Sequence, residues 1–263
     1  MSLQQIDQII SILNKQSKPY DWVMQEFAKV EELKNFDLDL ETFELLGLGL
    51  TLNKDNIFIL KTRTTKIKDE IFCIVDIEST GGVSKGEILE IGAVKIQNSK
   101  EIGRFQSFVK VKEIPENITE LTGITYEMVE NAPSLTKVLS DFRLFLKDSI
   151  FVAHNVRFDY SFISKALNEC GFGILLNRRI CTIEFAQCCI ESPKYKLEVL
   201  KEFLGVENTH HRALDDALAA AEIFKYCLGK LPYHIKTTEE LINFTKTAVR
   251  GILKRTCNYP KLF

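Results

Sequence analysis

The sequence predicts an α/β domain preceded by a smaller α+β domain. Two observations lead to this prediction. Within residues 1–65, apolar residues at helical spacing are followed by a short hairpin pattern. From Ile71 onward, strand patterns are combined with longer amphipathic helical patterns, as in a sheet covered by helices. We therefore expect three regions, at residues 1–65, 70–230 and 236–263.

The first region has the chain order of a winged helix, in which three helices precede a hairpin. Its predicted elements are helices at residues 6–13, 20–30 and 39–46 and strands at residues 50–52 and 57–61. Such a unit either docks nucleic acid or protein or forms a small packed appendage. Neither the first nor the third helix is basic, which argues against DNA binding. Polar residues 62–70 are expected to form a linker.

The second region begins with three strand patterns, at residues 72–80, 87–96 and 103–111. They are too close together for helical crossovers, so we expect an antiparallel meander. A fourth strand at residues 150–153 and a fifth at 179–182 follow later in the chain. The predicted helices lie at residues 115–119, 125–130, 134–146, 183–189 and 197–203, with two more beginning near Asn155 and Ala213.

A pair of acidic residues ends the first of these strands. Asp76 and Glu78 are separated only by Ile77, so their side chains point to the same face of the sheet. Two carboxylates at the end of a buried strand repel each other unless a cation or a proton is shared between them. Mg²⁺ prefers such oxygen ligands. The alternative is a strand that runs out into solvent, where acidic residues are common.

Two further carboxylates fall near element ends. Asp159 lies in the first turns of the helix after the fourth strand, where Asn155 is suited to capping, and it could simply favour the helix dipole. Asp216 lies in the helix that opens near Ala213, among alanines that leave space beside it. Alternatively, this helix packs closely through its alanines and its aspartates face solvent.

Four carboxylates from three segments can hold two divalent ions around a phosphate, and a nearby histidine can act as general base. These features indicate phosphodiester hydrolysis. Sequence spacing does not choose between His210 with Asp215 and His211 with Asp216, although only Asp216 has the alanine-lined face.

Five motifs, in this order and spacing, resemble the DEDDh (DnaQ-like) 3′→5′ exonucleases, most closely the proofreading epsilon subunit of bacterial DNA polymerase III. They are D-I-E-S-T-G, L-E-I-G-A-V, L-T-G-I-T, V-A-H-N-V-R-F-D and H-R-A-L-D-D-A, within residues 70–228. The resemblance implies an RNase H-like fold with a mixed five-stranded sheet flanked by helices. It also implies two Mg²⁺ or Mn²⁺ ions bound by Asp76, Glu78, Asp159 and Asp216, with His211 as base. Ile77, Thr80, Gly81 and Asn155 match positions that hold the terminal nucleotide.

Some parts of the sequence depart from that family. Ser79 stands where many members have threonine, and the first region and the tail after Lys230 are not part of the common pattern. The expected substrate is a single-stranded or frayed 3′ end, with DNA favoured over RNA. An RNA 3′-end trimming enzyme remains an alternative, because no motif reveals the fit at the 2′ position. A winged-helix binding module fused to a silent nuclease scaffold is an alternative of another class.

The tail from Thr237 has one apolar helical face, formed by Leu241, Phe244, Ala248 and Ile252, and several basic residues. Its last residues, 259–263, loosely resemble peptides ending in Leu-Phe that bind the bacterial sliding clamp. The tail therefore either recruits the clamp or the alpha subunit of DNA polymerase III, or packs back on the nuclease domain.

Composition limits the remaining possibilities. A formal net charge of -2 gives no general attraction to a nucleic-acid backbone, which argues against a long non-specific duplex binder. The seven cysteines include no C-x-x-C pair, so we expect reduced thiols and neither disulfides nor a zinc site. No export signal or apolar membrane span is recognisable, and we expect a cytoplasmic protein without a membrane partner.

Overall fold

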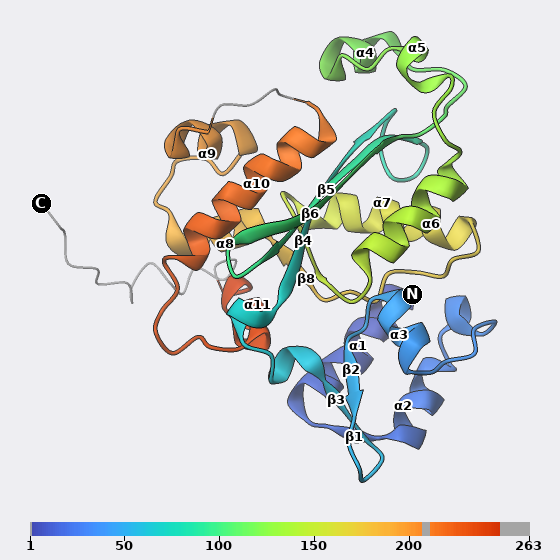
Figure 1. The fold of residues 1–263 in the computed structure, drawn as a ribbon, viewed down its shortest axis with the longest axis vertical. Helices are drawn as coiled ribbons and strands as arrows, with labels where there is room; N and C mark the ends of the chain where they lie inside the picture. The colour runs from blue at the N-terminus through green and yellow to red at the C-terminus, as the bar shows by residue number, and fades with distance from the viewer. Residues whose placement is uncertain (1, 207–210, 248–263) are drawn as a thin grey trace, which may run out of the picture.

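The computed structural model describes residues 2–206 and 211–247. Within this part of the chain it contains a three-stranded sheet in the order β1-β3-β2 and a five-stranded sheet in the order β6-β5-β4-β7-β8 (Figure 1). The small sheet belongs to the N-terminal unit at the bottom of the view, and the large sheet forms the centre of the molecule above it.

The N-terminal unit has the helix and hairpin order expected from the sequence. Its elements are α1 (Ser2–Lys15), β1 (Lys18–Pro19), α2 (Tyr20–Phe27), α3 (Leu40–Leu46), β2 (Leu50–Leu52) and β3 (Ile57–Leu60). The short strand β1, which pairs with β3, was not expected. Phe27, Phe43 and Phe58 are fully buried in the core of this unit, and Phe43 contacts the other two rings edge to face.

The large sheet is mixed, as predicted. Its strands are β4 (Ile71–Ser79), β5 (Ile88–Gln97), β6 (Lys100–Phe108), β7 (Ile150–Ala153) and β8 (Arg179–Cys181). Strands β4, β5 and β6 form the expected antiparallel meander. Strand β7 then pairs parallel with β4, and β8 pairs parallel with β7. The carboxyl ends of β4 and β7 therefore meet at one edge of the sheet.

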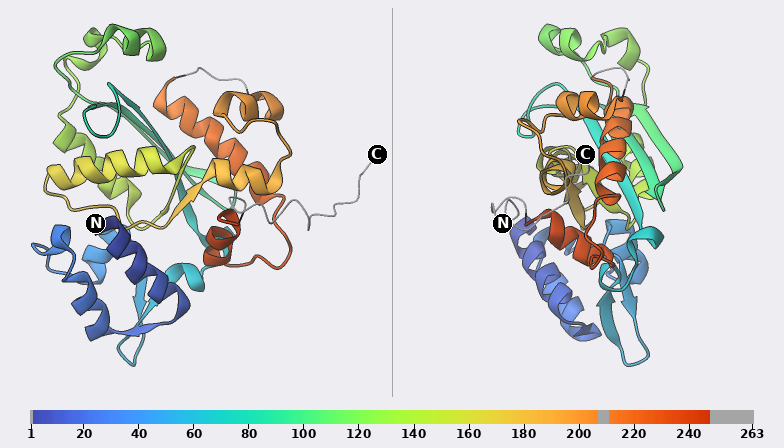
Figure 2. Two further views of the ribbon diagram at one scale, coloured as in Figure 1. Left: turned by 180° about the vertical axis from the view of Figure 1, so that it is seen from behind. Right: turned by 90° about the vertical axis from the view of Figure 1, so that its left-hand side faces the viewer.

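Helices cover both faces of this sheet (Figures 1 and 2). They are α4 (Glu116–Thr122), α5 (Tyr126–Val129), α6 (Leu135–Leu146), α7 (Val156–Glu169), α8 (Thr182–Cys189), α9 (Leu197–Leu204), α10 (Ala213–Leu228) and α11 (Thr238–Thr245). Helices α6 and α7 pack on one face, and α8 and α10 pack on the other. Helices α4 and α5 extend beyond the sheet edge and pack around a small apolar cluster that also includes Leu89 of β5.

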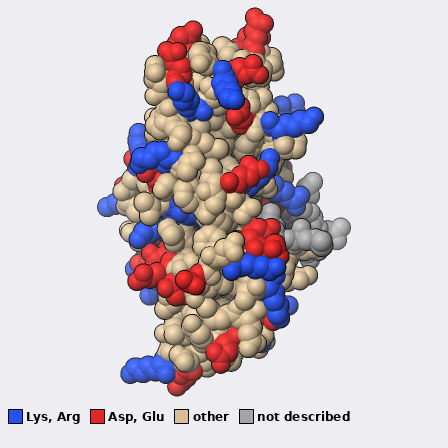
Figure 3. Space-filling model, turned by 90° about the vertical axis from the view of Figure 1, so that its right-hand side faces the viewer, with Lys and Arg blue, Asp and Glu red and all other residues tan. Residues whose placement is uncertain are grey.

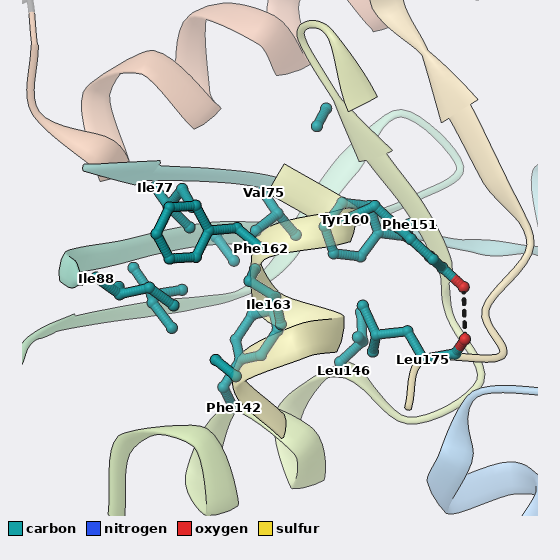
Figure 4. Close-up of a cluster of buried hydrophobic side chains, with 14 of the residues drawn as sticks. Val75, Ile77, Ile88, Phe142, Leu146, Phe151, Tyr160, Phe162, Ile163 and Leu175 are labelled. Carbon is teal, nitrogen blue, oxygen red and sulfur yellow. Dashed lines mark hydrogen bonds between the residues drawn. The ribbon is translucent and has the colours of Figure 1, made fainter. Parts of the chain in front are cut away.

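Side chains alternate strictly along β4. Val75 and Ile77 join the core beneath α6 and α7, where they lie against Phe162 and other aromatic side chains (Figure 4). Phe72 and Ile74 join the opposite core beneath α10. By the same alternation, Asp76 and Glu78 belong to the face that α10 covers.

The expected polar linker at residues 62–70 is wrong. These residues form two 3-10 turns, Lys61–Arg63 and Ile67–Asp69, which hydrogen-bond to the segment that leads into α11. Thr62 Oγ1 donates to Glu239 Oε2 at 2.7 Å, and Glu239 also forms a buried ion pair with Arg178. A buried carboxylate with both partners holds the junction together, which a count of polar residues along the chain does not reveal.

The described part of the predicted tail packs back on the sheet. Leu241 and Ile242 of α11 are fully buried in the core beneath α10. Thr237 and Glu240 form a capping box at the start of the helix. Ala248, Ile252 and the C-terminal Leu-Phe pair, on which the docking hypothesis depends, lie outside the described residues.

The N-terminal unit is joined to the large domain through a buried arginine. The Arg143 guanidinium of α6 donates to the carbonyl of Leu46 and to those of Phe172, Gly173 and Ile174. Ile174 is itself part of the apolar core of the N-terminal unit. The two units therefore share a core and a hydrogen-bond network instead of being tethered by a flexible segment.

Two expectations from composition can be compared with the described residues. The six cysteines among them are all free thiols, and burial raises the pKa of Cys73 to about 12. None of the helices within residues 2–206 and 211–247 has the length and apolar character that crossing a bilayer requires.

Candidate active site

The candidate site lies where β4 ends. Asp76 is opposite Gly92 of β5, and Glu78 is opposite Glu90. The regular register between the two strands shifts directly after Glu78, at Ser79. Both Asp76 and Glu78 are half-buried, so the end of this strand does not simply run out into solvent.

The start of α10 brings two more groups to this place. Ligand atoms of Glu78, His211 and Asp216 all lie within 4.8 Å of one another. Asp216 is in the first turn of α10 and is only 8% exposed, while His211 precedes the helix. The structure thus brings together the histidine and aspartate of the second pair. His210 lies outside the described residues.

The alanines around Asp216 have a different role from the one expected. Ala217 and Ala220 are buried in the core between α10 and the sheet, where they let the helix approach β4 and β5 closely. The sequence suggested that these alanines leave room for a bulky ligand, but the structure shows that they do not. The packing alternative accounts for these alanines, yet Asp216 faces the other acidic groups and not solvent.

Asp159 is a further buried carboxylate and comes from the helix on the other face of the sheet. It lies in the first turn of α7 and is 3% exposed. Burial raises its pKa to about 8, a rise opposed by the backbone N–H groups of Asp159 and Ile77 and supported by the charge of Glu78. Burial also raises the pKa of Asp76 well above its ordinary value, with the charges of Asp159, Asp216 and Glu78 adding to the effect.

These groups suit a hard divalent cation. The donors are carboxylate oxygens with one imidazole nitrogen beside them. The pKa of Glu78 is likewise raised, to about 7, first by burial and then by the charge of Asp216. Several neighbouring carboxyl groups disfavour each other's ionised forms, and a bound cation would relieve this repulsion.

Stability of the metal-free protein should therefore depend on pH. Asp159 and Glu78 bind protons more tightly in the folded state, with pKa values of about 8 and about 7, than in the unfolded chain, where their ordinary pKa values are 3.8 and 4.5. The folded state then holds more protons between these values, and the free energy of unfolding falls as pH rises from about 4.5 to 8. We expect the melting temperature in EDTA to decrease over this range and Mn²⁺ to restore it at pH 8. A melting temperature that rises with pH in EDTA would contradict these shifts.

The predicted nucleotide-binding residues lie around the same edge. Ile77 buries its side chain in the core, so only its backbone is available to a ligand. Thr80 closes the loop after β4, since its N–H donates to the Glu87 carbonyl and its Oγ1 accepts from the Glu87 N–H. Gly81 lies in this loop, where a Cβ on Gly86 would come within 2.6 Å of the Gly81 carbonyl oxygen.

Asn155 differs from its expected role. It occupies the N-cap position of α7, but it adopts a left-handed backbone conformation with φ 71° and its side chain does not cap the helix. In that conformation the side chain does not accept from the first helical N–H groups. It is the fourth predicted nucleotide-binding position, beside the carboxyl end of β7.

Three side chains near the site were not assigned from the sequence. His154 is structural, because its Nε2 lies 3.0 Å from the Tyr195 carbonyl oxygen and its Nδ1 lies 2.9 Å from Thr182 Oγ1. Burial lowers its pKa to about 4. Lys201 of α9 is 3% exposed, with Nζ 3.8 Å from Asp216 Oδ1. Glu90 of β5 is fully buried beside the start of α10. The L-E-I-G-A-V motif was the available signal for Glu90; Lys201 had none.

Gly92 shows how closely α10 rests on β5. A Cβ at this position would lie 2.2 Å from both the carbonyl carbon of Ala213 and the nitrogen of Leu214. Because the clash is with backbone atoms, no side-chain rotation can relieve it. Gly92→Ala should therefore displace the start of α10 and lower the free energy of unfolding by about 1–3 kcal/mol. Turnover should also fall. Urea denaturation and kinetics check this. Gly103→Ala is the control, because its Cβ would meet only Phe145 at 3.5 Å.

Residues 73–224 match the family model of the RNase T-type exonuclease, and the chain belongs to this exonuclease family. It is 40% identical over 181 residues to the PolC-type DNA polymerase III of Clostridium perfringens and 37% identical over 198 residues to that of Thermotoga maritima. These matches cover 65% and 74% of this chain but 12% and 14% of the polymerases, so the chain spans about an eighth of their length.

Solved exonucleases share the fold. Exonuclease X in complex with 5′ overhanging duplex DNA superposes with a TM-score of 0.54 at 22% identity, covering 66% of this chain and 99% of that one. The zinc-bound complex of Escherichia coli exonuclease I with single-stranded DNA gives a TM-score of 0.55 at 16% identity, covering 62% and 42%. The predicted RNase H-like fold and the resemblance to DnaQ-like exonucleases are thus confirmed.

Proposed function

We propose that this chain is a metal-dependent 3′→5′ exonuclease that hydrolyses DNA from its 3′ end, as a proofreading subunit or companion of the replicative DNA polymerase. The observation that supports this most is the grouping of Glu78, His211 and Asp216 within 4.8 Å. The charges of Asp159 and Asp216 help to raise the pKa of Asp76, which supports including all four carboxylates of the DEDDh pattern in this group.

The four carboxylates have the task of holding two Mg²⁺ or Mn²⁺ ions, which would lower the pKa of a bound water and neutralise charge on the scissile phosphate. His211 accepts the proton from the attacking water at an imidazole nitrogen. The backbone of Ile77 and Gly81, with Thr80 and Asn155, holds the terminal nucleotide so that its phosphodiester faces His211. Hydrolysis then releases a mononucleotide and leaves a shortened 3′ end.

Local contacts must provide the binding of nucleic acid. On the side of the molecule drawn in Figure 3, Lys and Arg side chains are interspersed with Asp and Glu, without a continuous basic stripe among the described residues. A single-stranded or frayed 3′ end that enters the carboxylate cluster fits this charge distribution better than a long duplex does.

DNA is favoured over RNA because the matched relatives are DNA polymerases and the solved neighbours hold DNA. The test compares initial rates on single-stranded DNA and RNA of matched sequence, with 5′ labels that reveal shortening from the 3′ end. Faster RNA shortening would favour the RNA-trimming alternative. Mononucleotide release that requires Mn²⁺ and stops with EDTA would dismiss the silent-scaffold alternative.

A polymerase context would place the chain in the cytoplasm, with the alpha subunit of DNA polymerase III or the sliding clamp as its partner. The C-terminal peptide 259–263 is the candidate contact for the clamp. Deleting residues 258–263 should leave the rate on free single strands unchanged and abolish clamp binding in a titration. Unchanged clamp binding after the deletion would remove this part of the proposal, because the peptide would then have no docking role.

A further inference from the structure

We infer that Glu90 is a positioning residue for His211 and acts by holding Arg212, the next residue in the chain, in a cluster that we call the clamp. The clamp consists of Glu90, Gln106, Phe108 and Arg212. The inference rests on the proposed function, in which His211 is the general base, and it gives a role to the acidic residue of the L-E-I-G-A-V motif.

Glu90 is a fully buried carboxylate whose oxygens have several donors. Arg212 donates to it twice, from Nε to Oε2 at 3.1 Å and from a terminal nitrogen to Oε1 at 3.0 Å. The backbone N–H of Ala213 donates to Oε2 at 3.2 Å. Gln106 Nε2 donates to Oε1 at 2.8 Å and fixes the carboxylate from the neighbouring strand. A bidentate arginine pair of this kind defines position as well as charge.

Phe108 holds Arg212 from a second side. The guanidinium carbon lies 5.0 Å from the centre of the Phe108 ring, which is a cation–π contact. Phe108 is the direct cross-strand partner of Glu90 in the pairing of β5 with β6. Glu90 and Phe108, which are paired across two strands, therefore both contact the side chain of Arg212, the residue that directly follows His211.

His211 needs such support because of its backbone. It has φ 57°, in the left-handed region that residues other than glycine rarely adopt. It lies two residues before the first residue of α10 and directly before Arg212, the N-cap residue. Because Glu90 holds Arg212 and Ala213, it fixes the backbone that directly follows His211 and so contributes to the direction in which His211 enters the cluster with Glu78 and Asp216.

Asp216 depends on this clamp less than His211 does. It is inside the helix, where its N–H bonds to the Arg212 carbonyl at 2.9 Å. The helix is also seated on the sheet through Gly92 and through buried Ala217 and Ala220. Loss of the clamp should thus misplace the histidine while the carboxylates remain close to their places.

The test is steady-state kinetics on 5′-labelled single-stranded DNA at saturating Mn²⁺. Glu90→Gln and Arg212→Lys should each lower kcat by about 10- to 100-fold, part of the usual contribution of a general base, with KM changed less than about threefold. Arg212→Lys keeps the charge but loses the bidentate fork. It therefore reports on position even where Glu90→Gln fails to fold. Glu101→Gln removes an exposed arginine pair on β6 and is the control.

The decisive comparison uses the His211→Ala background. If Glu90 acts through His211, adding Glu90→Gln to His211→Ala should change kcat by less than about twofold. A further loss as large as in the wild-type background would overturn the inference, as would wild-type kcat in Arg212→Lys. Full activity of His211→Ala alone would instead contradict the proposed base, so the two failures are distinguishable.

Discussion

Replacing Asp216 with alanine is expected to lower turnover by about four orders of magnitude or more, as when a member of a catalytic unit is removed. Asp216 lies within 4.8 Å of ligand atoms of Glu78 and His211, so its loss opens the carboxylate cluster at its centre. Asp76→Ala should have an effect of the same size. The measurement is single-turnover hydrolysis of a 5′-labelled DNA strand at saturating Mn²⁺.

Asp215→Ala is the matched control, since it removes the neighbouring carboxylate in the same helical turn. We expect its turnover to remain within about threefold of the wild type. An Asp216→Ala or Asp76→Ala variant that keeps more than about a tenth of wild-type turnover would refute the assignment of these carboxylates as ligands.

Stability should respond differently in the two variants. Asp76→Ala removes a carboxyl group whose ionised form is disfavoured by burial and by four neighbouring charges, so the metal-free protein should keep or gain stability. Asp216→Ala also takes a carboxylate away from Lys201, a buried ammonium 3.8 Å distant. It should therefore gain less than Asp76→Ala, or lose stability. Melting curves in EDTA at pH 8 compare the two.

Local patterns predicted the parts of the fold that depend on neighbouring residues. Alternation along β4 placed Asp76 and Glu78 on one face, and apolar spacing located α6 within one residue. These features depend on side-chain direction over a few positions. Motif order then related the chain to an exonuclease family, which the family match over residues 73–224 confirms.

Contacts between distant positions were beyond such patterns. Arg212 and Glu90 are 122 positions apart, and Thr62 and Glu239 are 177 apart, so neither pair leaves a trace in local spacing. The stretch 62–70 was interpreted as a linker because it is polar, and its buried partner, Glu239, lies far away in the sequence, in α11. Asn155 is a residue type that often caps helices, but its backbone is left-handed and its side chain does not cap α7. Burial of polar groups follows from tertiary partners, and composition alone does not show them.

His211→Ala is expected to lower the rate of the chemical step by about 10²- to 10⁴-fold, the usual contribution of a positioned general base. His210→Ala should stay within about threefold of the wild type. The sequence left the two histidines equivalent in spacing to the two aspartates. The structure places ligand atoms of His211 within 4.8 Å of Glu78 and Asp216, which accounts for the expected difference.

Single-turnover rates with saturating Mn²⁺ separate the chemical step from product release. Mn²⁺ affinity, measured in parallel, should change little in His211→Ala if the histidine moves a proton and the carboxylates hold the ions. A large loss of Mn²⁺ affinity would instead make His211 a ligand. If His210→Ala is the inactive variant and His211→Ala the mild one, the base is His210 and the partner aspartate shifts with it to Asp215.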